Sequence, residues 1–493
     1  MKKLYFILIS LSALSVLAIS ADIKVNSDTG KTWQGWPAIA AGEQGTALMW
    51  QEDIADSSFL YLQCLDTSGV PIGINIKLDS PKYRMLPAII AIANLGYAAV
   101  WMEIGDSSNG WDIYGQLFNA TGDSMAPAFK VNDDSLAERY CPDIVSDSQG
   151  NFTVVWMDSR NQWTIYGQRY SASGSPVSGN IALGDSAGCD PKICMKPDGN
   201  FAVTWQAETG NILWRRFDST GNSLSNSLRV NSRDVNLDYA QPVIAVNDSG
   251  NYCLSWNRLT VAGMAIMAQF YDSTGTPTGI NIVVNEDTLI WGGHVSVVPV
   301  ANNHFVIGWT DERDWVDNYC QCFYDCNQPE SNNLKISSAV ASGEKYRQSL
   351  ALASAGNNLF AAWMDLRDTS TSWDIYARKT SYQELGVEGS PDHLITPGRP
   401  VVNTNVYPNP SRTQITFSYS LQDVSGQVPV SLKIYNICGQ KINEINEGLK
   451  TSGTYGFKWG AKNIDSRALS AGIYFYRLTA GKLECKGKFV VLK

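Results

Sequence analysis

The fold is decided by one stretch of sequence, Asn151-Phe-Thr-Val-Val-Trp-Met-Asp-Ser-Arg-Asn-Gln-Trp-Thr-Ile-Tyr-Gly-Gln-Arg-Tyr170, because degraded copies of it recur along most of the chain. Phe152–Trp156 is an aromatic and β-branched run, and residues 158–162 are polar turn material. Residues 164–170 alternate with the period of two that is expected of a half-buried strand. The stretch therefore predicts a β-hairpin.

The Trp that ends the first strand of this hairpin recurs at intervals of 49 to 55 residues, as Trp50, Trp101, Trp156, Trp205, Trp256, Trp309 and Trp363. A short strand that often opens with Pro precedes each copy, and a polar turn, an alternating strand, a Gly turn and a last strand follow it. Four short strands in ~50 residues cannot bury both faces of their sheet, so we expect neighbouring units to stack radially. Tandem sandwich domains would need about 100 residues each. The sequence predicts an all-β protein, a seven-bladed β-propeller of four-stranded repeats followed by a small Ig-like β-sandwich.

An extra copy of the last strand of the repeat, Ile23-Lys-Val-Asn26, precedes the first complete unit. We expect it to supply the outer strand of the last blade and so to close the ring. His393-Leu-Ile-Thr396 competes for the same place. If the two ends of the repeat region do not meet in one blade, this interpretation is wrong.

The N-terminus has the pattern of a secretory signal peptide. Lys2 and Lys3 precede an apolar run, Leu4–Ile19, and small residues follow where a peptidase would cut. A retained membrane anchor is the rival interpretation, but the run is short. We expect a signal peptide at 1–21, the propeller at 22–397 and the sandwich at 398–493. The net charge of −9 argues against binding of nucleic acid, which needs clustered Lys and Arg, and no later stretch is apolar enough to span a bilayer.

The last ~90 residues follow a different pattern. They contain Val406-Tyr-Pro-Asn-Pro410 and Leu469-Ser-Ala-Gly-Ile-Tyr-Phe-Tyr-Arg-Leu478, with strands expected at 415–421, 430–435, 455–459, 472–478 and 486–492. This tail resembles the type A C-terminal sorting domain of bacterial type IX secretion cargo, with Tyr407, Pro408, Asn409 and Pro410 as its opening motif. The resemblance implies that the type IX secretion machinery is a partner. It also implies passage across the outer membrane, with cleavage of the tail and attachment to the cell surface as a further possibility.

An acidic residue stands two positions after the recurrent Trp in five units, and in three of them an Arg follows two residues later. These three pairs are Asp158 with Arg160, Asp311 with Arg313, and Asp365 with Arg367. A ring of such pairs on one face of the disc is a candidate ligand site, since Arg binds acidic or sugar ligands with bidentate geometry. The alternative is structural, because an Asp in a turn caps its own backbone and pairs with a nearby Arg.

The Cys and His residues give no catalytic or metal motif. We expect the cysteines to be buried small residues with one or two disulfides, such as Cys189 to Cys194, and a metal cluster at Cys320, Cys322 and Cys326 is the alternative. His304 stands in an apolar strand and is expected in the core. No catalytic residue and no cofactor is predicted.

Asp28, Gly30, Thr32 and Trp33 resemble the Asp-box turn of sialidase-type propellers, although only one copy is present and Asn26 replaces the usual Ser or Thr. This resemblance keeps a sialidase-like or other extracellular glycoside hydrolase as an alternative. The preferred interpretation is a secreted or cell-surface module that binds a surface glycan or an extracellular protein. A structural component of a surface layer is the third hypothesis.

Overall fold

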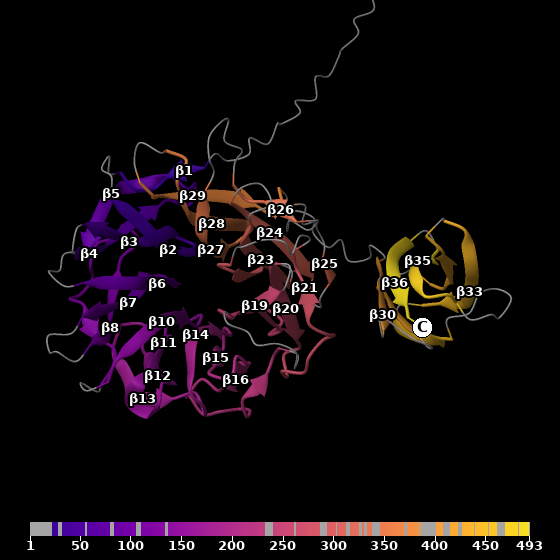
Figure 1. The fold of residues 1–493 in the computed structure, drawn as a ribbon, viewed down its shortest axis with the longest axis horizontal. Coiled ribbons are helices and arrows are strands. Elements are labelled where there is room, and N and C mark those ends of the chain that lie inside the picture. The colour runs from indigo at the N-terminus through magenta and orange to yellow at the C-terminus, as the bar shows by residue number, and fades with distance from the viewer. Residues whose placement is uncertain are drawn as a thin grey trace, which may run out of the picture. The chain divides into compact units, whose positions relative to one another are not determined.

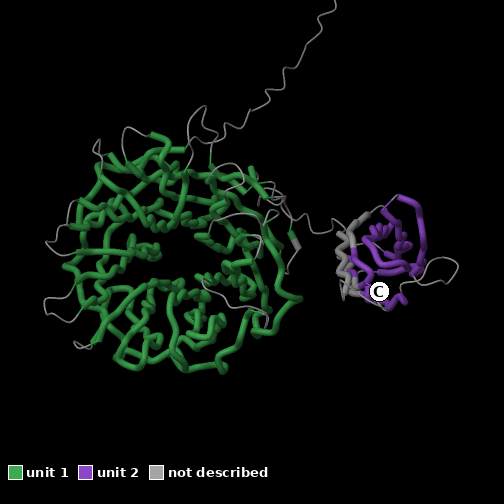
Figure 2. The backbone as a smooth tube through the Cα atoms, viewed as in Figure 1, with its two compact units in different colours: residues 1–390 green, residues 391–493 purple. Residues whose placement is uncertain are grey.

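The computed structural model describes residues 22–27, 32–54, 57–78, 83–104, 110–133, 137–231, 240–260, 263–285, 293–301, 303–311, 316–324, 328–329, 333–337, 346–368, 372–382, 384–385, 401–407, 415–422, 426–437, 439–451, 453–460, 469–481 and 483–492. The chain forms two units, 1–390 and 391–493 (Figure 2). The predicted signal peptide at 1–21 and the segment at 393–396 lie outside the described residues, as does the expected domain boundary at 397/398.

The first unit contains seven antiparallel sheets, called blades 1 to 7 in the order of their inner strands (Figure 1). The hairpin predicted from residues 151–170 is present in blade 3, where Trp156 pairs with Tyr166. Blades 1 to 3 consist of β2 (Trp33–Gly42), β3 (Gly45–Ile54), β4 (Ser57–Leu65) and β5 (Pro71–Leu78); β6 (Arg84–Ile92), β7 (Gly96–Ile104), β8 (Trp111–Phe118) and β9 (Phe129–Lys130); and β10 (Arg139–Ser146), β11 (Phe152–Asp158), β12 (Thr164–Tyr170) and β13 (Pro176–Ala182), with a 3-10 turn at Ser159–Asn161.

The remaining blades repeat this order, and blade 6 has a fifth strand that also pairs with β24. Blades 4 to 7 consist of β14 (Gly188–Met195), β15 (Phe201–Ala207), β16 (Ile212–Phe217) and β17 (Leu228–Arg229); β18 (Val243–Val246), β19 (Tyr252–Thr260), β20 (Gly263–Tyr271) and β21 (Ile282–Val283); β22 (Ser296–Val300), β23 (His304–Asp311), β24 (Asp317–Tyr324), β25 (Gln328–Pro329) and β26 (Leu334–Lys335); and β27 (Arg347–Ala355), β28 (Asn358–Asp365), β29 (Asp374–Ser381) and β1 (Ile23–Lys24).

The inner strands contact one another in blade order around a closed ring. The contacts run from β2 to β6, β10, β14, β18, β22 and β27, and β27 contacts β2 again. A separate hydrophobic cluster fills each of the seven spaces between neighbouring blades. The recurrent Trp residues lie in these clusters and are at most 2% exposed. The fold is therefore the predicted seven-bladed propeller, stabilised mainly by apolar packing between sheets that could not bury both faces alone.

Strand β1 closes the ring as predicted, because Ile23 pairs with Ala377 of β29 in blade 7. The Asn that ends this copy of the repeat explains the pairing. Asn26 Oδ1 accepts a hydrogen bond of 2.8 Å from the backbone N–H of Ile375, and its Nδ2 donates one of 2.8 Å to Asp374. The same bond from the start of the third strand to an Asn of the outer segment recurs in three other blades, from Ile113 to Asn132, Ile212 to Asn231 and Ile266 to Asn285.

The second unit contains two sheets, with strand orders β30-β31-β34 and β33-β32-β35-β36. Its core is aromatic, with Phe417 and Phe489 buried at its centre. Five of its strands match the predicted ones, whereas β30 and β33 were not predicted. The strands are β30 (Val401–Tyr407), β31 (Ile415–Gln422), β32 (Val428–Tyr435), β33 (Lys441–Lys450), β34 (Gly453–Trp459), β35 (Gly472–Ala480) and β36 (Leu483–Val491).

The expected disulfide between Cys189 and Cys194 is wrong, because both thiols are free. The two residues are five positions apart on one strand, β14, which places their Cα atoms about 15 Å apart and far beyond the reach of a disulfide. Cys320 and Cys322 share one face of β24 and are buried in the hydrophobic cluster between blades 6 and 7, while Cys326 lies outside the described residues. His304 is buried as expected, and its Nδ1 lies 3.1 Å from the carbonyl oxygen of Ala301.

Candidate functional site at the propeller axis

One residue near the start of each blade has a left-handed backbone conformation. The seven residues share positive φ values but no side-chain chemistry; they are Trp36 (51°), Leu86 (49°), Cys141 (54°), Asp190 (50°), Gln241 (38°), His294 (27°) and Ser349 (55°). A left-handed conformation is uncommon for a residue other than Gly and costs on the order of 1–3 kcal/mol. Because it recurs once in every blade, it is a property of the repeat, and we call these seven the axial residues.

A β-bulge in the inner strand produces this conformation. In blade 1 the pairing jumps from Gly35 with Gln51 to Ala38 with Met49, so two residues of β2 stand opposite Trp50. The same jump places a two-residue bulge opposite the recurrent Trp in blades 2, 3, 4 and 7. A bulge bends its strand and re-aims a side chain. In these five blades the Trp that defines the repeat in the sequence therefore lies opposite the residue that the blade turns toward the axis.

Proline follows the axial residue in blades 1 to 5, and Val295 and Leu350 take its place in blades 6 and 7. Pro has no N–H to donate to a sheet and is tolerated in strands at bulges. Its ring usually pushes the preceding residue into an extended conformation, so the left-handed backbone here is imposed by the blade and not by the local sequence. In the sequence the recurrent Pro indicates only the start of a strand. In blades 1 to 5 it also indicates the axial residue, which directly precedes it.

All seven axial residues line one cavity of about 510 Å³. Its other lining residues are their neighbours in the inner strands, among them Met85 and Lys192. The volume falls within the range of roughly 300–1,000 Å³ that is usual for small-molecule sites, and a mostly apolar lining with a few polar groups is also usual there. The ring of blades thus ends in a pocket at its centre whose side chains come from every blade.

Polar groups in the cavity have defined partners. The Cys141 thiol donates to Asp190 Oδ1 at 3.4 Å, and burial together with the Asp190 charge raises the pKa of the thiol to about 12. The Lys192 ammonium lies 3.6 Å from a carboxylate oxygen of Asp143. Burial lowers the pKa of His294, so its imidazole is neutral at pH 7. Cys141 is therefore a neutral donor in this site and not a thiolate nucleophile.

The predicted pair of Asp158 and Arg160 lies in the turn after β11. Asp158 caps this turn by accepting from the backbone N–H of Arg160 at 2.9 Å, and its other oxygen accepts from the Arg160 guanidinium at 2.7 Å and from Trp156 Nε1 at 2.9 Å. Burial raises the pKa of the Asp158 carboxyl, but these hydrogen bonds outweigh it, and the pKa is lowered. Burial also opposes the charge of Arg160, yet its bonds to Asp158 and Asp133 raise its pKa.

Asp365 and Arg367 repeat this arrangement in blade 7. Asp365 accepts from Trp363 Nε1 at 2.9 Å, and Arg367 donates both to Asp365 and, at 2.9 Å, to Asp22 beside the closing strand β1. In blade 6 Asp311 accepts from Trp309 Nε1 at 3.0 Å, and Arg313 lies outside the described residues. The carboxylates of these pairs are buried, and none of the five described residues lines the axial cavity. Their role as ligand-face residues stays a prediction.

A set of arginines in the inner strands was missed by sequence reasoning. Arg84 Nε lies 2.6 Å from Glu103, Arg139 Nε lies 3.4 Å from Asp158, and Arg347 Nε lies 2.9 Å from Asp365. Each Arg stands two residues before an axial residue, so the ion pair fixes the segment that leads into the bulge. The signal is a recurrent spacing of 18 or 19 residues between the Arg and the acidic residue after the Trp.

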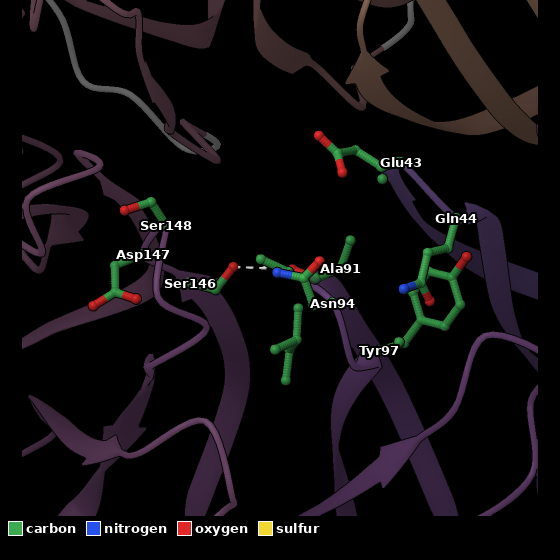
Figure 3. A pocket seen from close by; sticks show the side chains of 12 residues that line it. Glu43, Gln44, Ala91, Asn94, Tyr97, Ser146, Asp147 and Ser148 are labelled. Carbon is green, nitrogen blue, oxygen red and sulfur yellow. Dashed lines mark hydrogen bonds between the residues drawn. The ribbon is translucent and has the colours of Figure 1, made fainter.

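A second cavity, of about 400 Å³, lies at the other end of the inner strands of blades 1 to 3 (Figure 3). The β2–β3, β6–β7 and β10–β11 turns line it. Ser146 Oγ donates to the carbonyl oxygen of Ala91 at 3.0 Å, and Asp147 Oδ1 accepts from the backbone N–H groups of Gln149 and Asn151 at 2.9 Å. These polar groups stabilise the turns, so we regard the axial cavity as the candidate functional site.

Residues 405–492 match the family model of a secretion system C-terminal sorting domain. The C-terminal unit is a sorting domain. It marks the protein as cargo of type IX secretion, exported to the cell surface or secreted, with the secretion machinery as its partner. Strand β30 of the sorting domain ends at Tyr407, and Pro408, Asn409 and Pro410 lie outside the described residues. No helix within the described part of the chain is long and apolar enough to cross a membrane.

Several solved structures are similar to the chain at low identity. One is PorZ, a surface component of the type IX secretion system of Porphyromonas gingivalis, with 15% identity, a TM-score of 0.40, and coverage of 92% of this chain and 59% of PorZ. An ulvan lyase has 8% identity, a TM-score of 0.46, and coverage of 74% and 99%. A sialidase of Trypanosoma rangeli has 8% identity, a TM-score of 0.40, and coverage of 86% of both chains. No curated protein matches the chain.

Proposed function

We propose that this protein is an exported binding module and that the axial cavity of its propeller holds the ligand. One observation carries the proposal: the backbone of the seven axial positions is the same in every blade, while all seven side chains differ. Residues that stabilise the fold recur from blade to blade, as the recurrent Trp and the Asn of the outer segment do. A binding site for an asymmetric ligand must instead break the symmetry of the repeat.

The structure offers a rigid frame for such a site. The axial residues extend from strands whose other residues pack in the inter-blade clusters, and buried ion pairs precede three of them. Sites that are built on rigid elements hold their side chains in place, which lowers the entropy cost of binding. The sorting domain adds the location, since it directs the propeller to a place where extracellular ligands are available.

The alternative of a glycoside hydrolase receives less support. Such enzymes use two carboxylates about 5–9.5 Å apart on either side of the scissile bond. Among the described residues that line the axial cavity, Asp190 is the one carboxylate. Its neighbour Cys141 is a protonated thiol that donates to it. The cavity therefore supplies recognition groups more readily than a catalytic pair.

The test is a ligand screen on the full-length protein with a variant that fills the cavity. Trp already occupies the axial position of blade 1, so Leu86→Trp adds a large side chain at a backbone conformation that accepts it. Gln44→Trp, in the second cavity at the other end of β2, is the matched control. A ligand at 100 times its Kd stabilises the folded state by about 2.7 kcal/mol, which a thermal-shift screen detects. We expect Leu86→Trp to abolish the shift and Gln44→Trp to keep it, and the reverse pattern would refute the proposal.

A further inference from the structure

The axial cavity has two chemically different sides, and this division narrows the class of ligand. Blades 7, 1 and 2 contribute an apolar side with Leu350, Trp36, Pro37, Met85 and Leu86. Blades 3 to 5 contribute a polar side with Cys141, Asp190, Lys192 and Gln241, and His294 of blade 6 stands between the two. The inference below rests on the proposed function and concerns the same site.

Trp36 provides the largest surface of the apolar side. Trp36 is 38% exposed, whereas the seven recurrent Trp residues are at most 2% exposed. Its indole contacts the His294 ring edge-on, with 5.7 Å between ring centroids and 65° between ring planes. Blades 1 and 6 are not neighbours, so this contact spans blade 7 and places the two rings across part of the cavity. An exposed but fixed aromatic ring is a preformed surface for a flat apolar face.

The polar side offers hydrogen bonds with little net charge. The carboxylate of Asp190 and the ammonium of Lys192 carry opposite signs, and Lys192 is in turn held by Asp143. Cys141 donates its S–H to one oxygen of Asp190, which leaves the other oxygen to accept from a ligand. The Gln241 amide can both donate and accept, and so can the Ser349 hydroxyl, which blade 7 adds beside the apolar side. Because Lys192 is already paired with Asp143, a ligand carboxylate would be repelled by the charge of Asp190.

We propose that the axial cavity binds one neutral sugar residue of a surface or extracellular glycan. A pyranose has a C–H-rich face, which fits the exposed ring of Trp36, and a rim of hydroxyl groups, which fits Asp190, Gln241 and His294. Its hydroxyl groups need several donors and acceptors at once, and a site that is built for hydrogen-bonded hydroxyls discriminates strongly against analogues that lack them. The carboxylate of Asp190 disfavours a sugar that carries a carboxylate of its own, so a neutral sugar fits better than a uronic acid.

The experiment uses the full-length protein and a panel of methyl glycosides of neutral hexoses and N-acetylhexosamines. Methyl glucuronide and small primary amines are the charged comparisons. Saturation-transfer NMR detects binding, and calorimetric titration gives the Kd. We expect at least one neutral glycoside to bind, with a Kd that rises at least tenfold in Trp36→Ala and by about tenfold in Asp190→Asn. Trp36→Phe should recover part of the loss, and Gln44→Ala should leave the Kd unchanged. A cooperative thermal transition confirms that each variant is folded.

Two negative outcomes are distinguishable. If a charged probe binds, with the same dependence on Trp36 and Asp190, while every neutral glycoside fails, the sugar inference is wrong and the axial binding site stands. If no probe of any class binds the wild-type protein, and a broader thermal-shift screen gives no shift that Leu86→Trp removes, both the inference and the proposed function fall. Binding of a glycoside that Trp36→Ala leaves intact would also overturn the inference, since the sugar would then occupy another place.

Discussion

Asn26→Ala should weaken the propeller at the point where its ring closes. Asn26 makes two buried hydrogen bonds of 2.8 Å across the seam, one from the N–H of Ile375 and one to the carboxylate of Asp374. Alanine leaves that N–H without its partner, which costs about 1–3 kcal/mol, and removes one charge-assisted bond worth roughly 1.5–3 kcal/mol. Asp374 keeps the ammonium of Lys24 at 2.8 Å, which offsets part of this loss. We expect a net loss of about 2–4 kcal/mol in the free energy of unfolding.

The assay compares this variant with Asn231→Ala, in which the corresponding Asn of blade 4 is removed. Asn231 accepts from Ile212 at 3.0 Å, only 19 residues away, whereas Asn26 and Ile375 are 349 residues apart. Both variants should lower the midpoint of thermal unfolding of the full-length protein. Limited proteolysis should then release the N-terminal segment from Asn26→Ala and not from Asn231→Ala, because of these two bonds only the one made by Asn26 joins the two ends of the ring. Equal resistance of the two variants to proteolysis, or an Asn26→Ala midpoint equal to that of the wild type, would refute the closure argument.

Three further predictions concern the frame of the site. Arg347→Met should lower the free energy of unfolding by about 3–5 kcal/mol in a denaturant titration, because it leaves the buried carboxylates of Asp317 and Asp365 without the cation that they share. Arg169→Met, which removes an Arg that donates to an exposed carbonyl oxygen, is the control and should change this free energy by no more than about 0.5 kcal/mol. Burial opposes the charge of Asp158 and Asp365, but their arginine partners outweigh it and lower the pKa of both carboxyls. The two carboxylates therefore stabilise the folded state fully above the unfolded pKa of about 4, and this stabilisation is lost as pH falls through the lower folded pKa values. The midpoint of thermal unfolding should be constant from neutral pH to about 5 and drop below about pH 4, and a midpoint that does not change with pH in the acid range would contradict this. Gly188→Ala should destabilise the propeller by about 1–3 kcal/mol, because the added Cβ would stand 2.3 Å from the indole of Trp205. Gly179→Ala is the control and should be nearly neutral, since the atom nearest to its added Cβ would be 4.0 Å away; a calorimetric scan of both variants measures the difference.

The parts of the fold that the sequence predicts are those that repeat. The recurrent Trp indicates the number of blades because each copy has the same task, to fill the space beside its neighbour. The copy of the outer strand at Ile23-Lys-Val-Asn26 predicts closure for a similar reason, since its Asn makes the bond that the other Asn residues make. Periodic burial and periodic hydrogen bonding both leave a pattern in the chain.

The site could not be predicted in this way, because it depends on tertiary structure. An axial residue such as Leu86 adopts a left-handed conformation before Pro, which local preferences disfavour and the blade imposes. Its side chain also differs from those at the other axial positions, so it leaves no pattern. The pairing of Arg139 with both Asp158 and Asp112 of the preceding blade joins residues whose proximity follows only from stacking. The prediction of a disulfide between Cys189 and Cys194 was wrong for the converse reason. The two residues are close in the sequence, but they lie on one extended strand, which holds them far apart in space.

The bulge opposite the recurrent Trp, present in five of the blades, has a consequence for how this scaffold can change over time. The recurrent Trp fills the space between blades and the axial residue faces the cavity, so a codon change at an axial position such as Asp190 or Gln241 alters the cavity and leaves the Trp in place. Leu86 is the exception, because it also packs against the cluster between blades 2 and 3. Seven such codons, spread over the propeller region, each contribute one side chain to the cavity. Descendants of one ancestral propeller could thus diverge in what they recognise while remaining equally stable, and an engineer could randomise these seven positions in one library and retain a protein that still folds and is still exported.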